Sequence, residues 1–374
     1  MQIQQKEKKV EYLELIYDLI FVYIIGRNNS LLHHIDGGFI TGGAFLAYFM
    51  CTLAVIQIWN YSTFYINIFG RNGVRDHVFL FVNMFLLYYM ANGTVIQWQS
   101  SVYRYSVPWA MILINLGLQY IIEMKNHKSE PWVTHQLSIN ALILFIEAAL
   151  VGVHIFVFSI TGVSVPYVPI FFGMAAMIIY GIAGSVVPVD FAHLAERAML
   201  YVVFTFGEMI ISAASYFTDE ISFNSIYFAL MAFLIAAGLF LSYGTMYNKI
   251  IDKESVTNGL GYMTVHIFLI FALNNISVAL EFMRNEDVEL MPKTVFLTGS
   301  FVMYFTFMFL LARYAKRKCA FTIRTLLILV ISAVCFIGLM ILLRENMYLN
   351  IALSVIYIYA VYAMIYRQAK LNSD

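Results

Sequence analysis

Long apolar stretches separated by short polar breaks run along nearly the whole chain. A helix needs about 20 mostly apolar residues to cross the hydrocarbon core of a bilayer. Twelve stretches of this kind lie at 11–26, 39–67, 77–98, 106–123, 135–158, 166–186, 191–217, 222–247, 257–281, 294–312, 321–343 and 347–366. The pattern therefore predicts an all-α, polytopic helical membrane protein with about twelve transmembrane helices.

The composition supports this class and excludes several others. Of the 374 residues, 61% are hydrophobic and 12% are charged, which is about half the charged share of a soluble domain. The 22 basic and 22 acidic residues balance, so no net field attracts nucleic acid. Three cysteines lie far apart in apolar runs, and no phosphate-binding loop or paired-cysteine motif occurs. We expect no cofactor, no metal site and no nucleic-acid partner; the expected partners are the lipid bilayer and a small solute or ion.

The positions of the basic residues orient the predicted helices. Sixteen of the 22 lysines and arginines fall in loops on the side of the N-terminus, five fall on the other side, and Arg197 lies within a segment. Lysine and arginine accumulate in short cytoplasmic loops, so both termini are predicted to be cytoplasmic. The basic start leads into Glu11, Glu14 and Asp18 rather than into an uninterrupted apolar core, and we expect the first segment to be retained.

Two pentapeptides with a shared aromatic pattern indicate an internal repeat. Residues 61–65 (YSTFY) close the second segment, and residues 243–247 (YGTMY) close the eighth, 182 positions later. Such duplication is common in transporters. The hypothesis divides the chain into two six-helix halves, 1–190 and 191–374, and chance similarity is the alternative. The same offset relates two further pairs, Glu14 with Glu196 and Asn92 with Asn274.

Ionisable side chains inside the apolar segments are the candidate functional residues. Each costs about 2.5–3.5 kcal/mol on insertion scales, so such groups usually face a protein interior or a water-filled cavity. In the first segment Glu14 and Asp18 share one helical face. In the fifth, Asn140, Glu147 and His154 follow at heptad spacing, which is typical of a proton-handling stripe or, alternatively, of polar packing contacts.

The seventh segment carries the densest set of such groups: His193, Glu196, Arg197 and Glu208. Arg197 cannot lose its charge, so below the membrane interface it needs a carboxylate, for which the repeat offers Glu14 or Asp18 of the first segment beside Glu196. A structural ion-pair network is the alternative to a substrate site. In the ninth segment Asn274 and Glu281 lie one heptad apart.

Two of these motifs carry a family resemblance. The run 14–22 (ELIYDLIFV), together with the later motif at 193–200 (HxxERxxL) and Gly207-Glu208, resembles the bacterial low temperature requirement protein A family. The resemblance implies a multi-pass protein of the bacterial cytoplasmic (inner) membrane, linked by name to growth in the cold and without a settled biochemical activity. The loop 70–76 (GRNGVRD) is less acidic than in relatives, which argues against a metal role for that loop.

These observations favour a secondary transporter or channel-like permease for a small solute or ion over an enzyme, and proton coupling is a further hypothesis. The alternative is a membrane-embedded enzyme or lipid-modifying factor that supports growth in the cold, with His193 and Glu196 as its acid–base pair. The residues predicted to form the pathway are Glu14, Asp18, Glu147, His154, His193, Glu196, Arg197, Glu208, Asn274 and Glu281.

Overall fold

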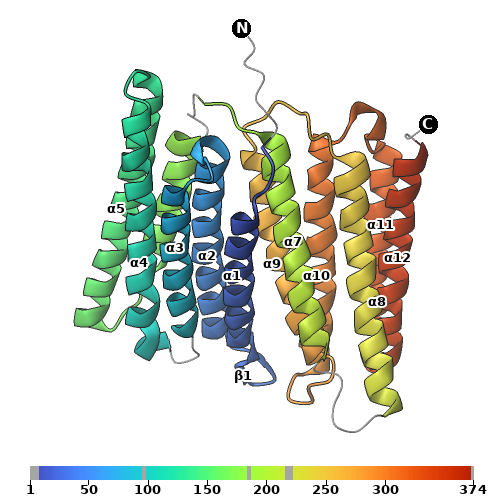
Figure 1. Ribbon diagram of the computed structural model, residues 1–374. Coiled ribbons are helices and arrows are strands. Elements are labelled where there is room, and N and C mark those ends of the chain that lie inside the picture. Colours follow the sequence, from blue (N-terminus) through green and yellow to red (C-terminus); the bar gives the residue numbers. More distant parts are fainter. Residues whose placement is uncertain (1–7, 95–97, 183–186, 215–221, 372–374) are drawn as a thin grey trace. The chain divides into compact units, whose positions relative to one another are not determined.

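A computed structural model describes residues 8–94, 98–182, 187–214 and 222–371 of the chain. Within these residues twelve α-helices follow the twelve predicted segments in order (Figure 1). The helices are α1 (Tyr12–Asn29), α2 (Gly42–Phe69), α3 (Val74–Asn92), α4 (Trp98–Glu123), α5 (Pro131–Thr161), α6 (Tyr167–Ala176), α7 (Phe191–Ala213), α8 (Phe223–Thr245), α9 (Leu260–Phe282), α10 (Leu290–Leu310), α11 (Ile323–Leu342) and α12 (Met347–Leu371). The all-α class is confirmed.

The predicted helix ends differ from the structure in several places. The helix α4 begins at Trp98 rather than at 106 and contains Pro108 in its interior; proline is tolerated inside membrane helices because neighbouring groups satisfy the freed carbonyl. The helix α6 continues as a π-helix, η3 (Met177–Ile182). Parts of three predicted segments, at 95–97, 183–186 and 215–217, lie outside the described residues.

Eight of these helices are long and apolar enough to cross a membrane: α2, α4, α5 and α8 to α12. The helix α6 is apolar but shorter. In contrast, α1 and α7 each carry three charged residues, namely Glu14, Asp18 and Arg27 in α1, and Glu196, Arg197 and Glu208 in α7. Length and composition thus support a multi-pass membrane protein, while twelve crossings stay a prediction.

The chain divides into two compact units. Unit 1 comprises Met1–His34, Thr41–Leu200 and Val256–Met263, and unit 2 comprises Ile35–Ile40, Tyr201–Ser255 and Thr264–Asp374. In unit 1, α4 packs on α3 and α5, α1 packs on α2 and α3, and α6 packs on α2 and α5. In unit 2, α12 packs on α8 and α11, and α11 packs on α10. The predicted halves at 1–190 and 191–374 and the internal repeat stay predictions.

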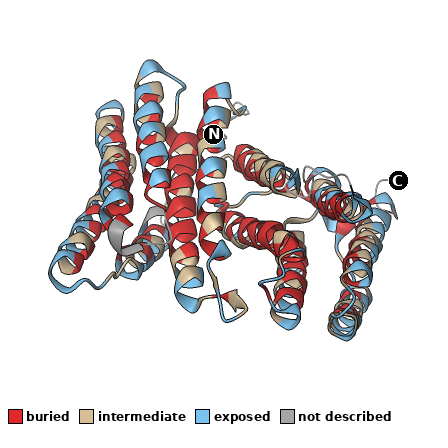
Figure 2. Ribbon diagram, turned by 90° about the horizontal axis from the view of Figure 1, so that it is seen from below, coloured by how far each residue is buried: buried red, intermediate tan, exposed pale blue. Residues whose placement is uncertain are grey.

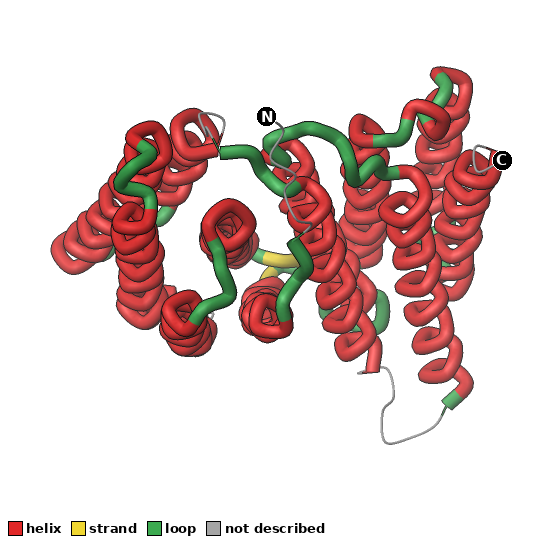
Figure 3. Tube along the Cα trace, turned by 45° about the horizontal axis from the view of Figure 1, so that its top comes forward, coloured by secondary structure: helices red, strands yellow, loops and turns green. Residues whose placement is uncertain are grey.

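Burial singles out α2 as the central helix of unit 1. Its side chains are buried over most of the stretch from Tyr48 to Phe69, whereas the apolar window of α11 in unit 2 is only 17% buried. In Figure 2 the buried residues lie on the sides of helices that face their neighbours within a unit. The loops are mostly short, and a small hairpin, β1 (Ile35–Asp36) with β2 (Phe39–Ile40), follows α1 (Figure 3). The central α2 therefore brings its polar groups to α1, α6 and α7.

Candidate functional site

Four charged or titratable side chains meet in the interior of unit 1, and we call Glu14, Asp18, His193 and Arg197 the charge cluster. Arg197 Nη2 lies 2.5 Å from Asp18 Oδ1, and Arg197 Nη1 lies 3.3 Å from Glu14 Oε2. His193 Nε2 is also 3.3 Å from Glu14 Oε2. Glu14 is 4% exposed and the other three residues are 0% exposed. Arg197 thus pairs with both Glu14 and Asp18, the two carboxylates of the first segment that could be its partners.

Trp59 on α2 completes the surroundings of Asp18. Its indole Nε1–H donates to Asp18 Oδ1 over 2.8 Å, and Arg197 Cζ lies 5.9 Å from the centroid of the ring. Next to this contact, Tyr17, which precedes Asp18 on α1, and Ser62 on α2 form a hydrogen bond of 2.7 Å between their hydroxyl groups. The sequence analysis missed Trp59; a tryptophan in the middle of an apolar segment was the available signal, because a buried indole N–H needs an acceptor.

Local hydrogen bonds hold His193 and the first turn of α7 in place. The carboxylate of Asp190 accepts the backbone N–H of His193 over 3.0 Å, as an N-cap residue does. Asn67 on α2 donates to the carbonyl of Asp190 over 2.8 Å and accepts from its N–H over 3.0 Å. The Asn67 Nδ2 atom also lies 3.0 Å from His193 Nδ1. Since an amide N–H donates, Nδ1 is the acceptor, and Nε2 carries the proton that faces Glu14.

The charge cluster combines two carboxylates with one guanidinium, and several of its buried atoms lack a hydrogen-bond partner within the described residues. These atoms are Glu14 Oε2, Asp18 Oδ2, His193 Nε2, Arg197 Nε and Arg197 Nη1. Unsatisfied buried polar groups are rare in folded proteins. The Lys8 ammonium group adds a positive charge within electrostatic range of Glu14.

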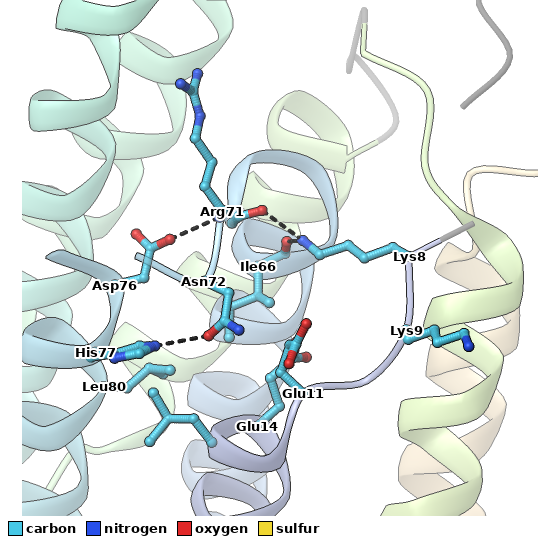
Figure 4. Close-up of a pocket in the computed structure, with 12 residues that line it drawn as sticks. Lys8, Lys9, Glu11, Glu14, Ile66, Arg71, Asn72, Asp76, His77 and Leu80 are labelled. Atoms are coloured by element: carbon cyan, nitrogen blue, oxygen red, sulfur yellow. Dashed lines mark hydrogen bonds between the residues drawn. The ribbon is translucent and has the colours of Figure 1, made fainter. Parts of the chain in front are cut away.

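A surface pocket of about 480 Å³ reaches the cluster at Glu14 (Figure 4). The N-terminal segment, the start of α1, the end of α2 and the start of α3 supply its lining. In Figure 4 Glu11 and Glu14 lie below Lys8, and His77 and Asn72 lie on the opposite side. The lining residues are Lys8, Lys9, Glu11, Leu13, Glu14, Ile66, Gly70, Arg71, Asn72, Asp76, His77 and Leu80.

Lys8 forms a wall of this pocket and ties two elements together. Its ammonium group donates to the carbonyls of Ile66 and, over 2.9 Å, Gly70 at the end of α2. Its backbone N–H donates to the carboxylate of Asp190 over 3.1 Å. Burial lowers the pKa of Lys8 below its ordinary value of 10.5, against the opposing field of Glu14.

The remaining predicted residues of unit 1 lie apart from the charge cluster. Glu147 is fully buried and accepts a hydrogen bond of 2.8 Å from the Tyr61 hydroxyl. His154 accepts the backbone N–H of Val165 over 3.1 Å. Glu196 is half-buried and takes no part in the ion pairs of the cluster. His193 faces Glu14 on the neighbouring helix, and the acid–base role expected for His193 with Glu196 stays a prediction.

Three predicted residues belong to unit 2. Asn274 is fully buried, and its amide atoms have no hydrogen-bond partner within the described part of the chain. Glu208 on α7 and Glu281 on α9 are half-buried and close enough to repel each other.

A second ionic network, at the ends of α3 and α4, was not foreseen. The carboxylate of Glu123 has no exposed surface and pairs with Arg71 over 3.2 Å, with Arg75, and with His127 over 3.2 Å. Asp76 pairs with Arg75 over 3.0 Å. The spacing of Glu123 and His127, four residues apart near a helix end, was the available signal. The basic side chains of the loop 70–76 thus serve ion pairs, and within the described residues no group of three or more His, Cys, Asp or Glu residues could hold a metal ion.

Comparison with known proteins places the site within a family. No curated protein and no solved structure matches the chain. Residues 9–362 match the family described as bacterial low temperature requirement A protein (LtrA), and this range includes the whole charge cluster. The chain therefore belongs to the bacterial low temperature requirement A protein family.

Proposed function

We propose that this protein is a proton-coupled permease for a small solute or ion, and that the charge cluster is its proton-binding site. Two observations carry the proposal. The side chains of the charge cluster are buried together, and one of them, Glu14, also lines the surface pocket. Ionisable groups at membrane depth are costly, and they mark ion pathways and proton relays.

The hydrogen-bonding pattern favours this function over a purely structural ion-pair network. A network that only holds helices together gains most when every buried donor and acceptor is satisfied. Here Glu14 Oε2 faces both His193 Nε2 and Arg197 Nη1 at 3.3 Å, while Asp18 Oδ2 and Arg197 Nε have no hydrogen-bond partner within the described residues. A proton or a solute can therefore replace contacts within the charge cluster at a small cost in free energy.

The charge balance supports coupling to protons. The charge cluster brings two acidic groups, Glu14 and Asp18, to one guanidinium, and the Lys8 ammonium group lies within electrostatic range of Glu14. A proton that binds a carboxylate of the cluster changes this balance, and a solute cation that binds the same carboxylate competes with the proton. Glu14 contacts both the pocket and His193, so a proton that enters the pocket can reach a carboxylate of the charge cluster directly.

The enzyme alternative has weaker support. Its expected acid–base residues are His193 and Glu196, whereas the ion-pair contact described for His193 is with Glu14. A lipid profile of a deletion strain grown in the cold checks the alternative, because a lipid-modifying enzyme must change acyl or headgroup composition.

Flux measurements on purified protein in liposomes test the proposal. A pH-sensitive dye inside the vesicles reports proton movement after imposed gradients of sodium, potassium, chloride or pH. We expect wild-type vesicles to move protons in response to at least one gradient, and Glu14→Gln and His193→Asn to abolish this movement. Glu11→Gln is the matched control, since Glu11 lines the same pocket outside the charge cluster. Wild-type vesicles that move no proton under any gradient would refute the proposal.

A further inference from the structure

A second buried carboxyl group lies between α2, α5 and α6, away from the charge cluster. Glu147 on α5 is fully buried, and its Oε2 accepts the hydroxyl proton of Tyr61 over 2.8 Å. On α2, Gln57 donates to the Tyr61 oxygen and, over 3.3 Å, to the carbonyl of Ile170 on α6. Glu147 Oε1 and Gln57 Oε1 have no hydrogen-bond partner among the described residues. Two unsatisfied oxygens therefore lie in one buried polar site.

The elements around this site supply no positive charge to Glu147. From α2 the titratable neighbour is Tyr61, and Tyr120 on α4 lies next to Tyr61. On α5 itself His154 is two turns away and accepts from Val165. No lysine, arginine or histidine of the described residues forms an ion pair with Glu147. An isolated carboxylate is far more costly to bury than a neutral carboxylic acid.

The backbone of α6 packs directly against the Glu147 carboxyl group at Gly173. A β-carbon added at Gly173 would overlap the carboxyl group of Glu147 and the amide of Gln57. The absence of a side chain at Gly173 is what lets the α6 backbone contact the carboxyl group. A metal cation would need several oxygen ligands at full bonding distance around it, whereas a proton adds no volume.

Three polar side chains of α5 contact the segment around α6 at three positions along the helix. Gln136 donates to the carbonyl of Tyr180 in the π-helix η3 over 3.3 Å, Glu147 faces Gly173, and His154 accepts from Val165 just before α6. Short π-helical stretches are frequent at functional sites. A charge appearing at the middle contact would draw water between α5 and α6.

We propose that Glu147 is a second proton-binding site, and that its proton holds α6 against α5 and α2. With the proton bound, the neutral carboxyl group packs under Gly173 and accepts from Tyr61. When the proton leaves, the carboxylate requires hydration, and α6 separates from α5. The inference goes beyond the proposed function, because it involves none of the residues of the charge cluster and can hold or fail separately from it.

Infrared spectroscopy of the purified protein in lipid vesicles tests for the proton. We expect a protonated-carboxyl C=O band that shifts in D₂O, is absent in Glu147→Gln, and moves to higher frequency in Tyr61→Phe because one hydrogen bond is lost. The matched control is Glu123→Gln, which removes a carboxylate paired with arginines and should leave the band intact. The proton assignment is wrong if folded Glu147→Gln keeps the band. It is also wrong if the band of the wild-type protein disappears on addition of sodium or potassium at constant pH.

Thiol labelling tests the movement of α6. In a Cys335→Ser background, which removes the exposed cysteine, Ile170→Cys places a thiol at a fully buried position of α6. At each pH the labelling rate of Ile170→Cys is divided by the rate of the same variant carrying Glu147→Gln, which removes the pH dependence of the labelling reagent itself. We expect this ratio to rise several-fold with pH. Phe171→Cys, at a 51% exposed position, should give a ratio that does not change with pH. Adding His154→Gln to Ile170→Cys should leave the increase of the labelling ratio with pH unchanged. A constant ratio at Ile170→Cys would overturn the coupling between the Glu147 proton and α6.

Discussion

Arg197 and Asp18 lie 179 positions apart in the chain, yet their side chains form an ion pair of 2.5 Å with no exposed surface on either residue. The pair joins the first turns of α7 to the middle of α1. Because a buried charge without a partner is very costly, this contact fixes which faces of α1 and α7 meet.

Replacing Arg197 with methionine should strongly destabilise the protein. The variant leaves two buried carboxylates, Glu14 and Asp18, without their cation, and breaking a buried pair in this way costs about 3–5 kcal/mol. Thermal unfolding in detergent measures the loss. Arg344→Met is the control, because Arg344 is 40% exposed and pairs at 3.8 Å with an exposed Glu345, so its loss should cost less than about 1 kcal/mol. Equal effects of the two variants would contradict the prediction.

Trp59→Phe should destabilise the protein by about 1.5–3 kcal/mol, the usual range for a hydrogen bond to a charged group. Phenylalanine keeps an aromatic ring near Arg197 but removes the N–H that donates to Asp18. The same substitution in an Asp18→Asn background should cost less, since the acceptor is then neutral. A double-mutant cycle on unfolding temperatures measures this coupling, and additive effects would refute it.

Glu123→Gln should weaken the packing of α3 against α4. The carboxylate of Glu123 is fully buried and pairs with Arg71, Arg75 and His127. The loss should be about 1–3 kcal/mol, because the arginines are partly exposed and can regain water. Glu130→Gln, at a side chain that is 55% exposed, should have almost no effect. Limited proteolysis of the loop 70–76 gives an independent readout, with faster cleavage expected in Glu123→Gln alone.

Lys8 should make stability depend on pH in the alkaline range. Burial lowers its pKa in the folded protein below 10.5, so the folded state gives up the proton before the unfolded state does. At pH values below the folded-state pKa, both states are protonated and folding bears the full cost of burying the charge. The cost disappears as pH rises towards 10.5. The unfolding temperature of wild type relative to Lys8→Met should therefore rise with pH over this interval, and parallel profiles would contradict this.

Gly173→Ala should disrupt the contact between α5 and α6. The added methyl group would overlap the Glu147 carboxyl group, and overpacking of this kind costs about 1–3 kcal/mol. Gly207→Ala is the matched control on another helix, because no atom of the described chain lies within 4 Å of a β-carbon at that position. Alanine favours helices by up to about 1 kcal/mol over glycine, so the control should be neutral or stabilising in a thermal unfolding assay.

The order and approximate bounds of the twelve helices could be predicted from the sequence, because apolar runs and polar breaks are local features. The need of Arg197 for Glu14 or Asp18 could be predicted as well, since a guanidinium keeps its charge and few acids lie in the apolar segments. In contrast, Glu196 and His193 could not be ranked from the sequence, although only His193 belongs to the charge cluster.

The tertiary structure decided which of these polar residues meet. Helix rotation determined that Asp18 receives Trp59, that His193 faces Glu14 rather than Glu196, and that Glu147 lies in a separate site under Gly173. The reason is physical: between membrane helices the apolar faces differ little from lipid, so close packing of small residues and matching of polar groups select the neighbours. Such matching depends on residues far apart in the chain, and no local pattern encodes it.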